Sequence, residues 1–154
     1  MQTEKKLDLL LAEYLQLQKS VEEFDARALT IKAWSVTLSA AGIVTAYVQT
    51  VPFVLVVSAL SALVFWLVEA SWKVNQQAFY KRIREIEGAM RTGNPEIAPL
   101  QIASSWSASW HAGRKNRKIL WVMSWMHVWL PHVPVAVGGI LLYWLLPPWN
   151  VGGS

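Results

Sequence analysis

Apolar or small side chains recur along the N-terminal region at alternating steps of three and four residues. The repeat comprises Leu7, Leu10, Tyr14, Leu17, Val21, Phe24, Ala28 and Ile31. Sustained over more than three heptads, it is typical of a coiled-coil seam. The same phase continues through Ser35, Leu38, Gly42 and Thr45. We therefore predict one helix that covers residues 3–32 and continues through the uncharged stretch 33–49.

A second long helix is predicted after a short break. Residues 49–52 (Gln-Thr-Val-Pro) interrupt the apolar pattern, and Pro52 is suited to the start of a helix. Residues 51–72 are almost entirely apolar or small, and residues 73–91 repeat the seam spacing through Gln76, Phe79, Ile83, Ile86 and Met90. A tight turn near residue 50 makes the two helices antiparallel, with paired residue numbers that sum to about 100. Leu17 is then expected beside Ile83, and Leu10 beside Met90.

The remaining chain predicts a loop and a third apolar segment. Residues 92–118 begin with a helix-stopping Thr-Gly-Asn-Pro sequence and place Ile102, Trp106 and Trp110 at helical spacing. A short helix at a membrane interface, with its Trp rings toward the membrane, is one interpretation, and an ordinary loop is the other. Residues 119–146 form a third stretch that contains Pro131 and Pro134. We expect one crossing, kinked around residues 127–134 or split into two half-helices.

Charge gives these elements a location and an orientation. All fourteen Lys and Arg residues lie in residues 1–32 or 73–118, and none lies in residues 33–72 or 119–154. Charge is costly inside a bilayer, and cytoplasmic segments collect Lys and Arg. We predict an all-α integral membrane protein with a long helical hairpin, a cytoplasmic antiparallel stalk and a third crossing. Its N-terminus is expected inside and its C-terminus outside.

Composition supports this class of protein. Apolar residues make up 54% of the 154 residues, and ten of these are Trp, more than a soluble domain of this size is expected to bury. The net charge of +4 follows from the orientation rule, and no nucleic-acid-binding module is recognisable. Anionic lipid is the expected partner of the basic cluster formed by Arg114, Lys115, Arg117 and Lys118. The chain has no Cys, which excludes disulfides and thiol chemistry. Because no catalytic motif is present either, we expect neither an enzyme nor a bound cofactor.

Small and hydroxyl residues within the apolar stretches are candidates for helix contacts or for a pore lining. They are Ser35, Thr37, Ser39, Gly42, Thr45, Ser58 and Ala62. Packing inside the hairpin is the favoured interpretation, and a water-accessible path built from several subunits is the alternative. Glu69 is the one acid in or near an apolar run. It is expected to pair with Lys73 or Lys32, or else to form an acidic ring at a pore mouth.

Two histidines and several large side chains complete the candidate residues. His127 and His132 flank Pro131 and are expected to bond carbonyls freed by the prolines or to respond to pH, a metal or haem site having less support. Trp121, Trp125 and Trp129 predict an aromatic strip toward lipid or another subunit. Leu9, Leu11 and Leu15 form a second apolar stripe, which suggests contact with another copy or another protein.

The layout of residues 4–91 resembles that of the SLATT-type small bacterial membrane proteins. A long cytoplasmic helix enters a first crossing, a tight turn follows, and a second crossing leaves as a basic amphipathic helix; the similar passages include residues 13–46 and 63–87. The resemblance implies a bacterial inner membrane and an oligomeric, membrane-permeabilising role. The third, Trp-rich segment and the lack of an attached sensor domain depart from that family. Two hypotheses follow: a homo-oligomeric pore or channel, and a non-conducting scaffold whose stalk recruits a partner.

Overall fold

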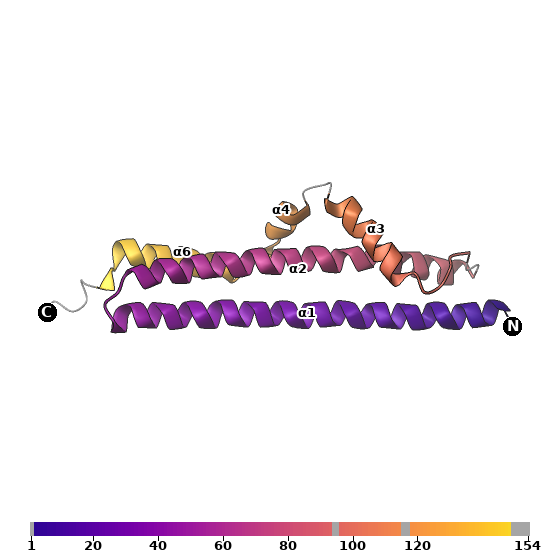
Figure 1. The fold of residues 1–154 in the computed structure, drawn as a ribbon, viewed down its shortest axis with the longest axis horizontal. Coiled ribbons are helices and arrows are strands. Elements are labelled where there is room, and N and C mark those ends of the chain that lie inside the picture. Colours follow the sequence, from indigo (N-terminus) through magenta and orange to yellow (C-terminus); the bar gives the residue numbers. More distant parts are fainter. Residues whose placement is uncertain (1, 94–95, 115–117, 149–154) are drawn as a thin grey trace. The chain divides into compact units, whose positions relative to one another are not determined.

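The computed structural model describes residues 2–93, 96–114 and 118–148, which form helices and no strand (Figure 1). Two long helices come first, α1 (Gln2–Val48) and α2 (Phe53–Thr92). Four shorter helices follow: α3 (Ile102–Arg114), α4 (Lys118–Met123), α5 (Met126–Trp129) and α6 (His132–Leu145). The all-α class and the two long helices predicted from the apolar periodicity are confirmed.

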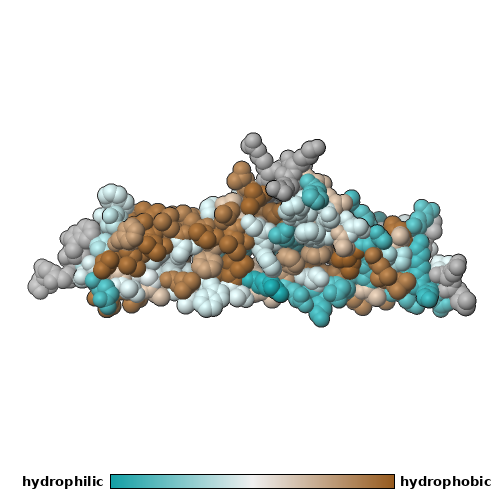
Figure 2. All heavy atoms as spheres, in the orientation of Figure 1, coloured by the Kyte–Doolittle hydropathy of each residue, from teal (hydrophilic) through white to brown (hydrophobic). Residues whose placement is uncertain are grey.

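The chain forms two compact units, and each contains part of α1 and part of α2. Unit 1 consists of the described residues of Met1–Arg27 and Trp72–Ile119. Unit 2 consists of those of Ala28–Ser71 and Leu120–Ser154. Figure 2 shows the contrast between them, since hydrophobic side chains predominate on the visible face of unit 2 and hydrophilic ones are frequent on that of unit 1.

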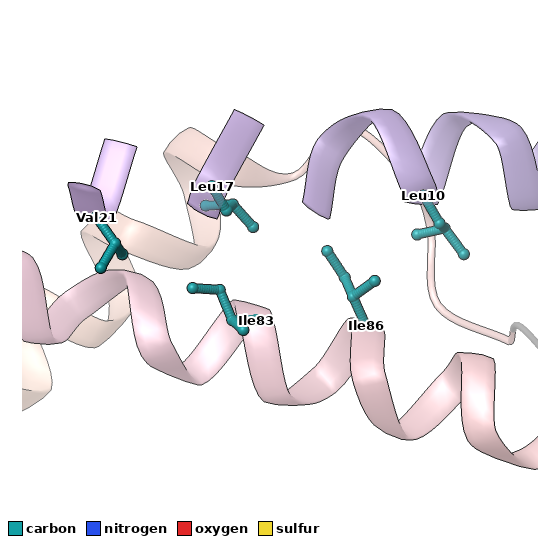
Figure 3. Packing of buried hydrophobic residues seen from close by; sticks show 5 residues of the cluster. All are labelled: Leu10, Leu17, Val21, Ile83 and Ile86. Carbon is teal, nitrogen blue, oxygen red and sulfur yellow. The ribbon is translucent and has the colours of Figure 1, made fainter. Parts of the chain in front are cut away.

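The core of unit 1 is the seam predicted from the heptad pattern. Leu10, Leu17 and Val21 of α1 face Ile83 and Ile86 of α2 (Figure 3). Aromatic and polar pairs follow the same antiparallel register, and they are Phe24 with Phe79, Tyr14 with Glu87, and Val21 with Gln76. The predicted pairing of residue numbers that sum to about 100 is therefore confirmed within this unit.

Helix α3 packs its aromatic side chains on α2. The Trp106 ring centroid lies 6.3 Å from that of Phe79, and the indole Nε1 donates to the Asn75 carbonyl at 3.2 Å. Trp110 stacks on Trp106 with centroids 6.1 Å apart. Of the two interpretations of this segment, a short helix or an ordinary loop, the structure shows the helix. The half-buried Trp106 ring is held by contacts within unit 1, and the expectation that the Trp rings face a membrane stays a prediction.

Helix ends follow their local sequence. Thr50 adopts a left-handed conformation with φ of 52°, and the Val51 amide donates to the Ala46 carbonyl at 3.0 Å, which closes the end of α1. Pro52 then accepts a hydrogen bond from the Leu55 amide as α2 begins. At the other end of α2, Gly93 has φ of 65°, the left-handed conformation that glycine adopts without strain.

Unit 2 is held by close approach between small residues. A Cβ atom added to Gly42 would lie 1.9 Å from Ser58 Oγ, and one added to Gly139 would lie 3.3 Å from Ala59 Cβ. Ala59, Ala62 and Ala136 form a buried cluster that joins α2 to α6. Such residues let helix backbones approach closely. Both α1 and α2 are long and apolar enough to cross a membrane.

The third apolar segment is split, as one of its two predicted forms requires, but into three helices and not into two half-helices. Residues 119–146 form α4, α5 and α6, with breaks at residues 124–125 and 130–131, and not one kinked helix. Pro131 directly precedes α6 and Pro134 lies in its first turn, where a missing amide hydrogen is tolerated. The prolines therefore begin a helix. At 1.5 Å per residue, the 14 residues of α6 extend about 21 Å, less than the roughly 30 Å of a hydrocarbon core.

The seam also shifts along α1. Leu38 and Thr45 are exposed, whereas the neighbouring Ser39 and Ala46 are fully buried. The prediction that the heptad phase continues unchanged through residues 33–49 is wrong by one position. An α-helix that is not supercoiled drifts by about 20° per heptad, so a contact face drifts to the next residue after several heptads.

Candidate functional site

A network of four polar side chains lies inside unit 2. Lys32 and Ser35 come from α1, Glu69 from α2 and His132 from the first turn of α6. The antiparallel register of α1 and α2 brings Lys32 opposite Glu69, and the chain break before α6 allows His132 to be the first residue of its helix. The site therefore depends on all three helices.

The contacts form a chain of hydrogen bonds. Lys32 Nζ lies 2.5 Å from Glu69 Oε1, and Glu69 Oε2 lies 2.9 Å from His132 Nε2. The other ring nitrogen, His132 Nδ1, lies 2.7 Å from Ser35 Oγ. Both carboxylate oxygens and both imidazole nitrogens are thus bonded.

Burial is nearly complete. The Glu69 and His132 side chains are 0% exposed, Ser35 is fully buried, and the Lys32 side chain retains 21% exposure. Buried ions are tolerated when they are paired and their remaining hydrogen-bonding positions are filled. Here the ammonium group balances the carboxylate, so the network with a neutral imidazole carries no net charge.

The network accommodates two protonation states of the imidazole. An ionised Glu69 accepts only, so His132 Nε2 carries a hydrogen. In the neutral ring Nδ1 then accepts from the Ser35 hydroxyl, and in the charged ring Nδ1 donates to the same oxygen. Ser35 can change from donor to acceptor without a change in the heavy-atom contacts.

The sequence left two possible partners for Glu69, Lys32 and Lys73, and the structure shows which of them it contacts. Glu69 pairs with Lys32, while Lys73 bonds Asp25 and Gln76 within unit 1. His132 bonds two side chains where freed carbonyls were expected, and His127 is exposed on α5, so the two histidines do not form a pair. Sequence reasoning treated Glu69 and His132 separately. Ionisable residues are rare in apolar segments, and the presence of one in each of two such segments could have predicted that Glu69 and His132 pair.

The small and hydroxyl candidates separate into a buried and an exposed set. Ser39, Ser58, Ala62 and the largely covered Gly42 lie at the contact between helices, and Ser39 Oγ donates to the Ser58 carbonyl at 3.3 Å. Thr37 and Thr45 are exposed on α1, in a row with Ala33 and Ala41. The buried set serves packing inside unit 2. The exposed set remains for contacts outside it.

The other candidates lie in separate places. Trp121 is exposed on α4, and Trp125 and Trp129 are half-buried beyond a helix break, so the three do not lie on one helix. The Trp121 and Trp125 rings are nevertheless in edge-on contact, with centroids 4.7 Å apart. Leu11 and Leu15 are exposed on unit 1, and Leu9 is half-buried. In the basic cluster, Lys115 and Arg117 lie outside the described residues, as do the side chains of Arg114 and Lys118.

A second buried ion pair lies in unit 1. The charged run of residues 81–87 is, as a sequence, typical of a solvated helix face. Arg82 of this run is nevertheless only 4% exposed and bonds Glu13 through Nε and Nη2 at 2.8 and 3.0 Å. Glu13 also accepts from the Leu100 and Gln101 amides at 2.7 and 3.2 Å. Arg82 donates to the Ala98 carbonyl at 2.7 Å. The pair fixes the segment before α3, whereas Arg84 is exposed.

The contacts of this pair shift the pKa of both of its members. Burial alone would raise the pKa of Glu13, but the hydrogen bonds from Arg82 and from the Leu100 and Gln101 amides, with the guanidinium charge, leave that pKa below its ordinary value. The hydrogen bond to Glu13 raises the pKa of Arg82. Both groups are therefore held in their charged forms.

Comparisons with protein families, curated proteins and solved structures gave no match. The resemblance to SLATT-type proteins stays a prediction. The geometry of the two units is the basis for the function proposed below.

Proposed function

We propose that this chain is a multi-pass protein of the bacterial inner membrane that assembles into a homo-oligomeric channel regulated by protonation at His132. Its membrane location is supported by two helices of sufficient length and apolarity and by the confinement of Lys and Arg to two segments. An inside N-terminus and an outside C-terminus fit the same charge distribution. The contact of Tyr47 with Leu146, and of Ser35 with His132, makes α6 parallel to α1, which agrees with that topology.

The observation that carries the proposal is the buried network of Lys32, Ser35, Glu69 and His132. Ionisable groups within apolar segments are costly and mark functional sites in membrane proteins. In the network, the charges of Lys32 and Glu69 balance each other, so a proton on His132 adds one net positive charge. His127, the other histidine in the described part of the third segment, is exposed and lies outside the network. Net charge weakens packing in a dry site. We infer that acidification loosens the junction of α6 with α1 and α2.

The exposed hydroxyl row on α1 supports an assembly of several copies. Thr37 and Thr45 lie on the outside of a unit whose other exposed side chains are mostly large and apolar. Polar and small residues on an otherwise lipid-compatible surface favour helix association. In a ring of copies this row faces the axis and supplies hydroxyl groups to permeating ions, as polar side chains do in pores.

Ion flux from liposomes tests the proposal. We expect purified wild-type protein to release an entrapped ion faster at about pH 5.5 than at about pH 7.5. His132→Gln retains a donor for Glu69 and an acceptor for Ser35 but cannot gain the proton, so it should lose the pH response. His127→Gln replaces an exposed histidine in the same way, so this matched control should keep the pH response.

Each arm of the experiment has a refuting result. Liposomes that remain impermeable at both pH values, with protein shown to be inserted, contradict a channel. Equal flux at both pH values, or an unchanged pH response in His132→Gln, contradicts the role of the network while leaving conduction in place.

A second function is favoured by the exposed Leu11 and Leu15 on unit 1, which are 47% and 59% exposed. A non-conducting scaffold would use this apolar stripe to bind a partner. Leu11→Glu with Leu15→Glu should then release a stoichiometric partner during mild extraction. Arg84→Glu probes the charged surface of α2, whereas Arg82 is unsuitable because its burial makes any substitution structural. Absence of a partner from the wild-type preparation contradicts this alternative.

A further inference from the structure

A groove between α2 and α3 in unit 1 has the features of an anion site. It has a volume of about 230 Å³ and is lined by Lys81 and Arg84 of α2 and by Ser109 and Trp110 of α3, among others. At about 30 Å³ per water molecule, this space admits a small polyatomic anion with a few waters. We propose that it binds a phosphate group, carried by a free phosphate or by a lipid headgroup.

The first supporting observation is an unsatisfied hydroxyl. Ser109 Oγ is buried and has no hydrogen-bond partner among the described residues. Other helical serines of this chain bond the carbonyl four residues earlier, as Ser20 and Ser71 do with Gln16 and Leu67. A buried polar group without a partner is rare in folded proteins, and a ligand that accepts its hydrogen removes the cost.

The second observation is positive charge beside that hydroxyl. Arg84 is exposed, and no ion pair involving it occurs within the described part of the chain. Lys81 has one long contact, at 3.9 Å from Glu85, whose other oxygen faces Arg82. Both cations are therefore available to a ligand, although Glu85 lies close by.

The donor set selects the class of ligand. A hydroxyl, an ammonium and a guanidinium group all donate, and together they match an anion with several acceptor oxygens around one centre. A guanidinium group binds phosphate through two parallel hydrogen bonds, and an ammonium group adds a point charge. Arg84 and Lys81 contribute from the rim, and Ser109 supplies the inner contact once its covered hydroxyl turns toward the groove.

Titration of full-length protein in a non-ionic detergent tests the site. Inorganic phosphate is one probe, and soluble dihexanoyl phosphatidic acid is the other, with dihexanoyl phosphatidylcholine as its neutral-headgroup comparison. Binding is followed by calorimetry at constant ionic strength. We expect saturable binding of at least one phosphate probe. Preference for inorganic phosphate indicates a soluble ligand, and preference for phosphatidic acid indicates a lipid.

Variants separate ligand binding from structure. Arg84→Gln should weaken binding about tenfold or more, since it removes a charge-assisted contact. Ser109→Ala should weaken it less, by about threefold to tenfold, without lowering thermal stability, because it deletes a hydroxyl that has no partner. Lys19→Gln, an exposed position outside the groove, is the control and should bind as wild type.

Two results overturn the proposal. One is the absence of saturable binding by both phosphate probes in folded protein. The other is equal affinity in wild type, Arg84→Gln and Ser109→Ala, which would place any bound phosphate elsewhere. Neither result depends on ion flux, so this site and the proposed channel are tested separately.

Discussion

Arg82→Ala should release the segment that precedes α3. Glu13 receives four hydrogen bonds, two from Arg82 and two from the Leu100 and Gln101 amides, and its side chain is 0% exposed. The substitution leaves a buried carboxylate without its counter-charge, which costs about 3 to 5 kcal/mol in comparable pairs. It also removes the donor to the Ala98 carbonyl. The two amides should therefore lose most of their protection from solvent.

Hydrogen–deuterium exchange measures this loss directly. A tenfold change in an equilibrium constant corresponds to about 1.36 kcal/mol, so exchange of the Leu100 and Gln101 amides should accelerate by roughly two to nearly four orders of magnitude. Arg84→Ala, two residues along α2 at an exposed position, is the matched control. Wild-type protection at residues 100–101 in folded Arg82→Ala would refute the reasoning, since it would mean that the ion pair does not hold this segment.

Three further predictions concern packing, hydrogen bonding and pH. Gly42→Ala should lower stability by about 1 to 3 kcal/mol, because its Cβ meets Ser58 Oγ, and Ser58→Ala should recover most of the loss in thermal unfolding of the double variant. Ser35→Ala should lower stability by about 1 to 3 kcal/mol, since it removes a bond to buried His132, whereas exposed Thr37→Ala should have little effect in the same assay. Because the folded pKa of Glu13 is lowered, its stabilisation is complete above its unfolded value of about 4.3 and is lost as pH falls through the folded value. Acid should therefore release residues 98–101 in wild type, and Glu13→Gln should flatten that pH dependence of exchange.

The long helices were accessible to sequence reasoning because their pattern is strong and local. Leu10, Leu17 and Ile83 lie in the core as the heptad spacing requires. The turn near residue 50 fixed the register, since two long antiparallel helices joined by so short a connection have little freedom to slide. The end of α2 was likewise predictable locally, because Gly93 directly follows Thr92 and adopts a left-handed conformation that suits glycine.

Contacts between distant segments were not accessible in the same way. Arg82 looked solvated because its neighbours Lys81 and Glu85 are charged, and its partner Glu13 is 69 residues away. The segment with Leu100 and Gln101 packs over this pair, and it has no periodic pattern of apolar residues from which its position could be predicted. His132 and Glu69 are separated by 63 residues, and only the start of α6 brings the ring to the carboxylate.

The pairing of Glu69 has a consequence for the order in which unit 2 is assembled. Lys32 precedes Glu69 by 37 residues, so the ammonium group is already present when the carboxylate is synthesised. His132 follows 63 residues after Glu69, as the last member of the network to leave the ribosome. We expect α1 and α2 to pair first as a charge-balanced intermediate, with the imidazole completing the site in a separate, later step.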